Sequence, residues 1–95
     1  MKLRVQVTEA DIESGDCSTS HCAAALALKR ALVDAGLAPN VSFVPGGALF
    51  INRKRCHAPP EMRDFGRAFD TWNNRGRLGT APSPPPPFEV EVQLP

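Results

Sequence analysis

Cysteine and histidine residues are grouped at two places in the chain where side chains of these types could bind a metal ion. Cys17, His21 and Cys22 lie close together before a predicted helix, and a second pair follows a predicted hairpin. Zinc is bound tetrahedrally by four such sulfur and nitrogen ligands. The spacing in neither group is that of common structural zinc sites, and adjacent Cys56 and His57 are an awkward ligand pair. We therefore expect no metal or other cofactor. A zinc-stabilised interaction module is kept as an alternative, with Cys17, Cys22, Cys56 and His57 as its ligands.

A nucleophilic role for Cys22 is a second possibility, because a helix amino end can lower the pKa of a thiol. Cysteine is, however, commonly buried as a small apolar residue, and Cys22 falls on the apolar side of the predicted helix. His21 and His57 are typical of surface or capping positions. The sequence predicts no catalytic residue, and we expect that the protein is not an enzyme.

Basic residues are clustered, although the whole chain carries a net charge of only +1. Residues 50–80 contain seven Arg or Lys against three Asp or Glu, a local balance of +4. Guanidinium and ammonium groups donate charge-assisted hydrogen bonds to carboxylates and phosphates. The residues expected to bind a partner are Arg53, Lys54, Arg55, Arg63 and Arg67.

The elements that position these residues follow from the hydrophobic pattern. Apolar and polar residues alternate over 3–7 and again over 88–94, which predicts two half-buried strands. Residues 20–35 and 59–72 carry apolar residues at spacings of three and four, which predicts two helices. Two short β-prone runs within 41–52, separated by a Pro-Gly-Gly sequence, predict a hairpin, followed by a basic loop.

These elements predict one α+β domain over residues 1–95, with a proline-rich connector at 80–87 that acts as an extended spacer. The order strand, helix, hairpin, helix, strand is that of the ferredoxin-like split βαβ arrangement, a mainly antiparallel sheet with two helices. In that arrangement the last strand pairs with the first. The pairing would place Glu89 and Glu91 across from Lys2 and Arg4.

Composition limits the class of protein. An apolar share of 42% with 22% charged residues is ordinary for a folded chain. The longest apolar run is far shorter than the ~20 residues of a spanning helix, and the N-terminus lacks a leader pattern, so we expect no membrane association. Three cysteines do not form a secreted disulfide framework. We expect a cytoplasmic protein with reduced thiols, either a monomer or a weak homodimer.

The first third of the chain resembles small uncharacterised proteins encoded by tailed phages and prophages of high-GC bacteria. The residues that carry the resemblance follow the first predicted strand: Asp11, Ile12, Gly15, Asp16, Cys17 and Cys22, leading into 23–28. The resemblance implies the cytoplasm of a bacterial host. It also implies an accessory or anti-defence protein, such as an anti-CRISPR, that acts by occupying a host surface.

The leading hypothesis is a small non-enzymatic protein that binds a macromolecular partner, for example as an inhibitor of a host defence complex. The alternative is direct nucleic-acid binding through the basic 53–77 segment. Trp72 shares its helix face with Phe65 and Phe69, which favours a core position over a stacking platform. Phe43 and Phe50 could stack bases, but one face of each strand has to fill the core. A protein partner is therefore favoured over nucleic acid.

Overall fold

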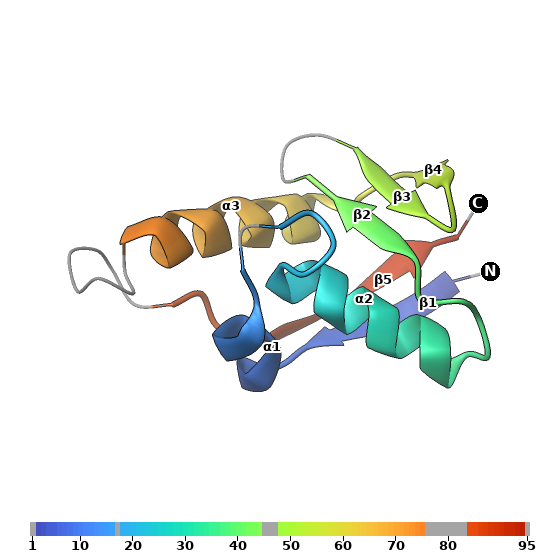
Figure 1. The fold of residues 1–95 in the computed structure, drawn as a ribbon, viewed down its shortest axis with the longest axis horizontal. Helices are drawn as coiled ribbons and strands as arrows, with labels where there is room; N and C mark the ends of the chain where they lie inside the picture. Colours follow the sequence, from blue (N-terminus) through green and yellow to red (C-terminus); the bar gives the residue numbers. More distant parts are fainter. Residues whose placement is uncertain (1, 17, 45–47, 76–83, 95) are drawn as a thin grey trace.

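The computed structural model describes residues 2–16, 18–44, 48–75 and 84–94 of the chain (Figure 1). Within these residues the fold is of the α+β class, as expected, and its helices and strands are β1 (Lys2–Val7), α1 (Glu9–Ser14), α2 (Ala23–Asp34), β2 (Val41–Phe43), β3 (Leu49–Ile51), β4 (Lys54–Cys56), α3 (Pro60–Arg75) and β5 (Phe88–Gln93). No helix in this part of the chain has both the length and the apolar character needed to cross a bilayer.

The first and last strands form a two-stranded antiparallel sheet, which confirms the predicted pairing. Leu3 pairs with Val92 and Val5 with Val90, so the alternating apolar residues of both strands face the core. On the exposed face, Nε of Arg4 lies 3.4 Å from a carboxylate oxygen of Glu89. Both side chains of this ion pair are more than half exposed, so the pair adds little stability.

The hairpin belongs to a second sheet, with the strand order β2-β3-β4. The basic loop expected after β3 is absent from the described residues, because Lys54–Cys56 forms β4 and pairs with β3. The single sheet of the ferredoxin-like arrangement is likewise not formed by the strands that the structure describes. A tight turn at Asn52 and Arg53 folds the chain back onto β3, so the hairpin gains its third strand locally rather than from β1.

A third helix precedes the two that were predicted. Thr8 and Asp11 form a capping box: the Thr8 N–H donates to Oδ2 of Asp11 at 2.9 Å, and the Asp11 N–H donates to Oγ1 of Thr8 at 3.3 Å. This reciprocal pair satisfies two backbone donors that a helix start otherwise leaves free. It turns the chain from β1 directly into α1.

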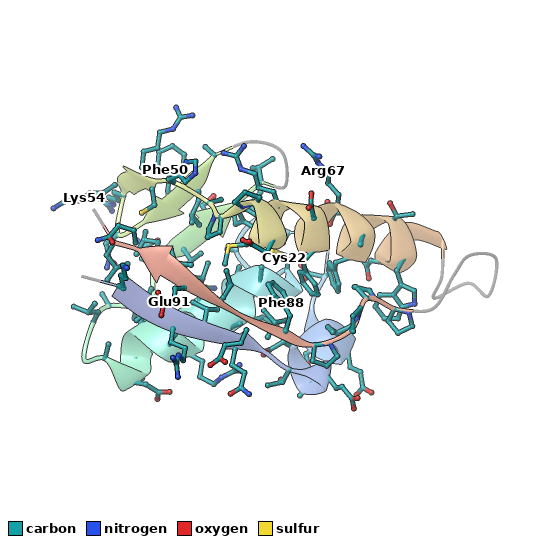
Figure 2. All side chains as sticks on the ribbon, turned by 180° about the vertical axis from the view of Figure 1, so that it is seen from behind. Cys22, Phe50, Lys54, Arg67, Phe88 and Glu91 are labelled. Carbon is teal, nitrogen blue, oxygen red and sulfur yellow. The ribbon has the colours of Figure 1, made fainter. Side chains whose placement is uncertain are left out.

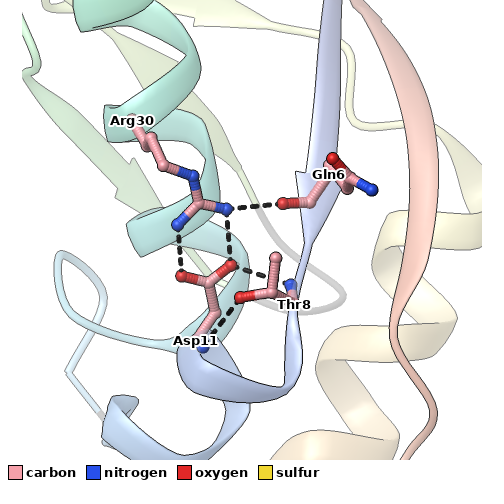
Figure 3. Close-up of polar contacts among 4 residues, drawn as sticks. All are labelled: Gln6, Thr8, Asp11 and Arg30. Carbon is pink, nitrogen blue, oxygen red and sulfur yellow. Dashed lines mark hydrogen bonds and ion pairs between the residues drawn. The ribbon is translucent and has the colours of Figure 1, made fainter.

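The same carboxylate is held by Arg30 of α2 (Figure 3). Each carboxylate oxygen of Asp11 accepts a 2.7 Å hydrogen bond from the guanidinium, which also donates to the backbone oxygen of Gln6 at 2.6 Å. Burial raises the pKa of Asp11, but the hydrogen bonds from Arg30 and Thr8 outweigh burial and hold that pKa below its ordinary value of 3.8. One side-chain pair thus joins β1, α1 and α2.

The core lies between the two sheets and the helices. Gly15, at the end of α1, approaches its neighbours so closely that a Cβ there would lie 2.7 Å from the Ala23 nitrogen and 2.9 Å from the Phe69 ring. Phe65 and Phe69 are buried on the inner face of α3, as their spacing predicted. The Phe65 ring also lies 4.8 Å, centroid to centroid, from Phe88 of β5, which fixes that strand beneath the helix.

The Asp11–Arg30 pair generates the first prediction. Replacing Arg30 with Met leaves the Asp11 carboxylate, whose side chain is 5% exposed, without its cation. Breaking a fully buried ion pair costs about 3 to 5 kcal/mol of stability. Because the Arg30 side chain is 45% exposed, we expect the free energy of unfolding at neutral pH, measured with urea, to fall by about 2 kcal/mol.

The pH dependence provides the control. The pKa of folded Asp11 lies below its ordinary value, so the stabilisation is present above about pH 4 and is lost as the pH falls through the folded-state pKa. The difference in free energy of unfolding between the wild type and Arg30→Met should therefore decrease as the pH is lowered. In an Asp11→Asn background the same Arg30→Met change should cost little at any pH. A difference in free energy of unfolding that did not change with pH would contradict this account.

Candidate functional site

The outer face of the three-stranded sheet presents an aromatic side chain beside a basic one. Leu49 and Ile51 are buried, whereas Phe50 between them points outward and is 39% exposed. Phe50 pairs with Ser42 on one side and with Arg55 on the other. Since directly paired residues project from the same side of a sheet, Arg55 lies next to Phe50 on this face.

The turn between β3 and β4 carries two further basic residues of the predicted set. Asn52 and Arg53 have φ angles of 52° and 68°, the left-handed values required at both central positions of a type I′ hairpin turn. Asn tolerates this region, but Arg pays a steric cost for it. Arg53 and the following Lys54 are exposed at the tip of the sheet.

The remaining two predicted residues lie on α3. Arg67 is exposed one helical turn beyond the half-buried Arg63. Figure 2 shows Phe50 and Arg67 along one side of the molecule, Lys54 at the end of the three-stranded sheet, and Glu91 of β5 on the opposite side from Phe50 and Arg67. We call this surface the basic face and define it as Phe50 with Arg53, Lys54, Arg55, Arg63 and Arg67.

A cleft of about 290 Å³ lies within the basic face. The residues that line it come from the second sheet, the segment after β4 and α3, namely Ala48, Arg55, Cys56, His57 and Arg63. The structure thus brings together Arg55 and Arg63. It leaves Arg53, Lys54 and Arg67 outside the cleft lining.

His57 in this cleft was not assigned to the basic site from the sequence. The position of His57 could have been predicted from the pairing register that a two-residue turn imposes on the strands before and after it. If Asn52 and Arg53 form a two-residue turn, Phe50 must pair with Arg55, and Ala48 must lie across from His57. The absence of glycine from the turn concealed this register.

The cysteines lie in separate environments. Cys22 is buried at the start of α2, and burial, with a smaller effect from Asp70, raises the pKa of its thiol, which does not favour a nucleophilic thiolate. The Cys56 thiol donates to the backbone oxygen of Lys54 at 3.5 Å, and burial raises its pKa as well. Cys17 lies outside the described residues. Among those described, no group of three or more His, Cys, Asp or Glu is arranged to hold a metal ion.

His21 lies at the surface beside two serine hydroxyls, immediately before the Cys22 N-cap of α2. Its Nδ1 lies 3.0 Å from the Ser20 hydroxyl and 3.4 Å from that of Ser18. The histidine is exposed, in keeping with the surface position expected from the sequence, but no side chain among the described residues caps the start of α2.

A larger cleft, of about 420 Å³, lies away from the basic face, where the end of the proline run meets α1 and α3. It is lined by Trp72, Pro84–Pro87, Ile12, Glu9 and Glu13. Trp72 is half-buried and its ring lies 6.0 Å from that of Phe69, so it packs with the core aromatics. Of the predicted 80–87 connector, residues 80–83 lie outside the described residues. The two carboxylates make this cleft unsuitable for an acidic partner.

Comparison with known protein families, with curated proteins and with solved structures finds no match for this chain.

The strained turn generates the second prediction. Replacing Arg53 with Gly should stabilise the protein by about 1 kcal/mol, because glycine adopts positive φ without a Cβ clash and Asn-Gly is a preferred type I′ sequence. Urea unfolding measures the change. Arg53→Ala removes the same charge but keeps Cβ, so it should give no such gain. Equal stabilisation by both variants would show that charge, not backbone strain, is responsible.

Asp70 of α3 generates the third prediction. Burial raises the pKa of this carboxyl, so the charged form destabilises the folded state above the raised pKa, and the effect disappears below the ordinary value of 3.8. Asp70→Asn should therefore raise the midpoint of thermal unfolding by a few degrees at neutral pH and leave it unchanged at about pH 3. A lower midpoint at neutral pH would show that the charged carboxylate has a stabilising contact.

Proposed function

We propose that this protein is a non-enzymatic binding protein that attaches through its basic face to an acidic surface of a macromolecular partner. The observation that carries the proposal is the exposed Phe50 on a sheet face, with Arg55 directly beside it and Arg53 and Lys54 at the adjacent tip. Aromatic and arginine side chains are enriched among residues that dominate binding energy at protein interfaces.

The sheet beneath this face is well anchored. Phe43 and Leu49 are fully buried, and Val41 and Ile51 nearly so. The inner face of the sheet therefore holds the outer face in place, and binding would not require these strands to become ordered. Phe50 and Arg55 thus lie on the side of the strands opposite the core residues Leu49 and Ile51.

A protein partner is favoured over nucleic acid because exposed carboxylates lie on and around the basic face. Glu9 and Glu13 line the cleft at another side of the molecule, and Glu89 and Glu91 are exposed on β5. Asp64 is exposed between Arg63 and Arg67 along α3. A phosphate backbone that followed the surface beyond the basic face would meet these carboxylates, whereas a compact acidic protein patch would not.

The resemblance of the first third of the chain to phage and prophage proteins suggests a biological setting for this binding. In that setting the protein is an anti-defence inhibitor, of the anti-CRISPR kind, that occupies a surface of a host defence complex. It would act in the cytoplasm of the bacterial host as a monomer or weak homodimer.

Direct nucleic-acid binding is the second candidate. It is favoured by the adjacent Phe50 and Arg55 on a sheet face, because such surfaces can stack a base on the ring while the guanidinium contacts a phosphate. The two candidates differ in salt dependence: each phosphate contact adds to a steep loss of affinity with salt, which a mixed aromatic and polar protein interface does not share.

The proposal generates the fourth prediction. Arg53→Glu with Lys54→Glu should leave stability within about 0.5 kcal/mol, because both side chains are exposed. Capture of the partner from nuclease-treated bacterial lysate should fall at least tenfold, owing to lost attraction and lost ion pairs. The captured protein would then be purified and its Kd measured for each variant.

The matched control is Lys2→Glu with Lys29→Glu, which makes the same change in net charge away from the basic face. This control should retain partner affinity. Equal affinity of the wild type and the Arg53/Lys54 variant would exclude the basic face. Strongly salt-dependent binding to labelled single-stranded RNA or DNA, without a nuclease-resistant protein partner, would favour the second candidate.

A further inference from the structure

Arg63, which lines the cleft of the basic face, has one buried side-chain nitrogen without a partner among the described residues. Nε of Arg63 is buried and has no hydrogen-bond partner within the part of the chain that the structure describes. An unsatisfied buried donor is costly, and more so when it belongs to a charged group. An acceptor for this nitrogen is therefore missing from the described residues.

The other lining residues favour an anion as that acceptor. Arg55 contributes a second guanidinium and His57 an imidazole. Burial keeps the Cys56 thiol neutral by raising its pKa, so it adds no negative charge. None of the described residues that line this cleft is acidic. The described lining therefore carries two guanidinium groups and no carboxylate.

We propose that this cleft binds a phosphomonoester group. Two guanidinium groups and an imidazole from three different segments can donate to several oxygens of a tetrahedral anion, whereas a planar carboxylate is satisfied by one arginine fork. Two positive charges also match a phosphate dianion better than the single charge of a carboxylate or of a phosphodiester. The volume of about 290 Å³ leaves room for part of the group esterified to the phosphate.

This inference rests on the proposed function in one respect, since it assigns a ligand chemistry to part of the same basic face. Arg55 and Arg63 line the cleft, while Arg53 and Lys54 do not. The two proposals are therefore tested by different residues. Phosphate binding can fail while the Arg53/Lys54 variant still loses its partner, and the reverse can also occur.

The test is a titration with inorganic phosphate at about pH 8, where phosphate groups of this kind are dianionic, with chloride replaced so that ionic strength stays constant. Backbone and arginine side-chain NMR signals report the site. We expect saturable shifts confined to residues 48, 55–57 and 63, with a Kd on the order of millimolar for so small a ligand. Absence of saturation, or equal shifts around Lys2 and Lys29, would overturn the proposal.

The matched variants are Arg63→Gln and Arg67→Gln, which remove the same charge from neighbouring turns of α3. Arg63→Gln should weaken phosphate binding at least tenfold, whereas Arg67→Gln should bind as the wild type does. Arg55→Gln, at an exposed position of β4, gives a second measurement should Arg63→Gln fail to fold, and it too should weaken binding. Equal affinity of the Arg63 and Arg67 variants would overturn the assignment.

The source of the phosphate is identified by further ligands. Phosphoserine and a nucleoside 5′-monophosphate both carry the required group, and the one that binds more tightly identifies the class of molecule that supplies it. Dimethyl phosphate and acetate carry a single charge and should bind at least tenfold more weakly. Affinity for dimethyl phosphate equal to that for phosphoserine would contradict the monoester assignment.

Discussion

The hydrogen-bonded ion pair between Asp11 and Arg30 is the contact on which the arrangement of the first half of the chain depends. The carboxylate caps α1 through Thr8, and the guanidinium also reaches the backbone of β1 at Gln6. These bonds set α2 along β1 and start α1 at a fixed angle to both. Gly15 can then bring the end of α1 against the start of α2 and the Phe69 ring, where no side chain would fit.

This scaffold separates the residues that fold the protein from those that meet solvent at the basic face. Leu49 and Ile51 contribute to the core, and Phe50 between them does not. The sheet that carries Phe50 is short, but α2 packs against β2, and Phe43 is fully buried. The basic face can therefore vary in sequence while the core stays intact, which is typical of surfaces that recognise a particular partner.

Local patterns in the sequence were sufficient to predict some of the strands and helices but not others. Alternation over 3–7 and 88–94 identified both strands of the first sheet, because each strand buries one face over its whole length. The third strand of the second sheet was missed because the turn at Asn52 and Arg53 lacks glycine and Lys54–Cys56 has no clear apolar alternation. Arg30 and Asp11 are 19 positions apart, so their contact depends on how α2 packs and not on any local spacing.

The same limit applies to the candidate site. Clustering of charge along the chain identified the basic residues, but it could not distinguish exposed basic side chains from partly buried ones. Arg53, Lys54 and Arg67 are exposed, and their charges act mainly through long-range attraction, which is weak at contact and reduced by salt. Arg63 is different, because one of its donors is buried within a cleft, where an unmet hydrogen bond is costly. In the proposed interactions, attraction to an acidic partner would therefore be shared among many charges, whereas discrimination between anions would fall to Arg63 and its cleft neighbour Arg55.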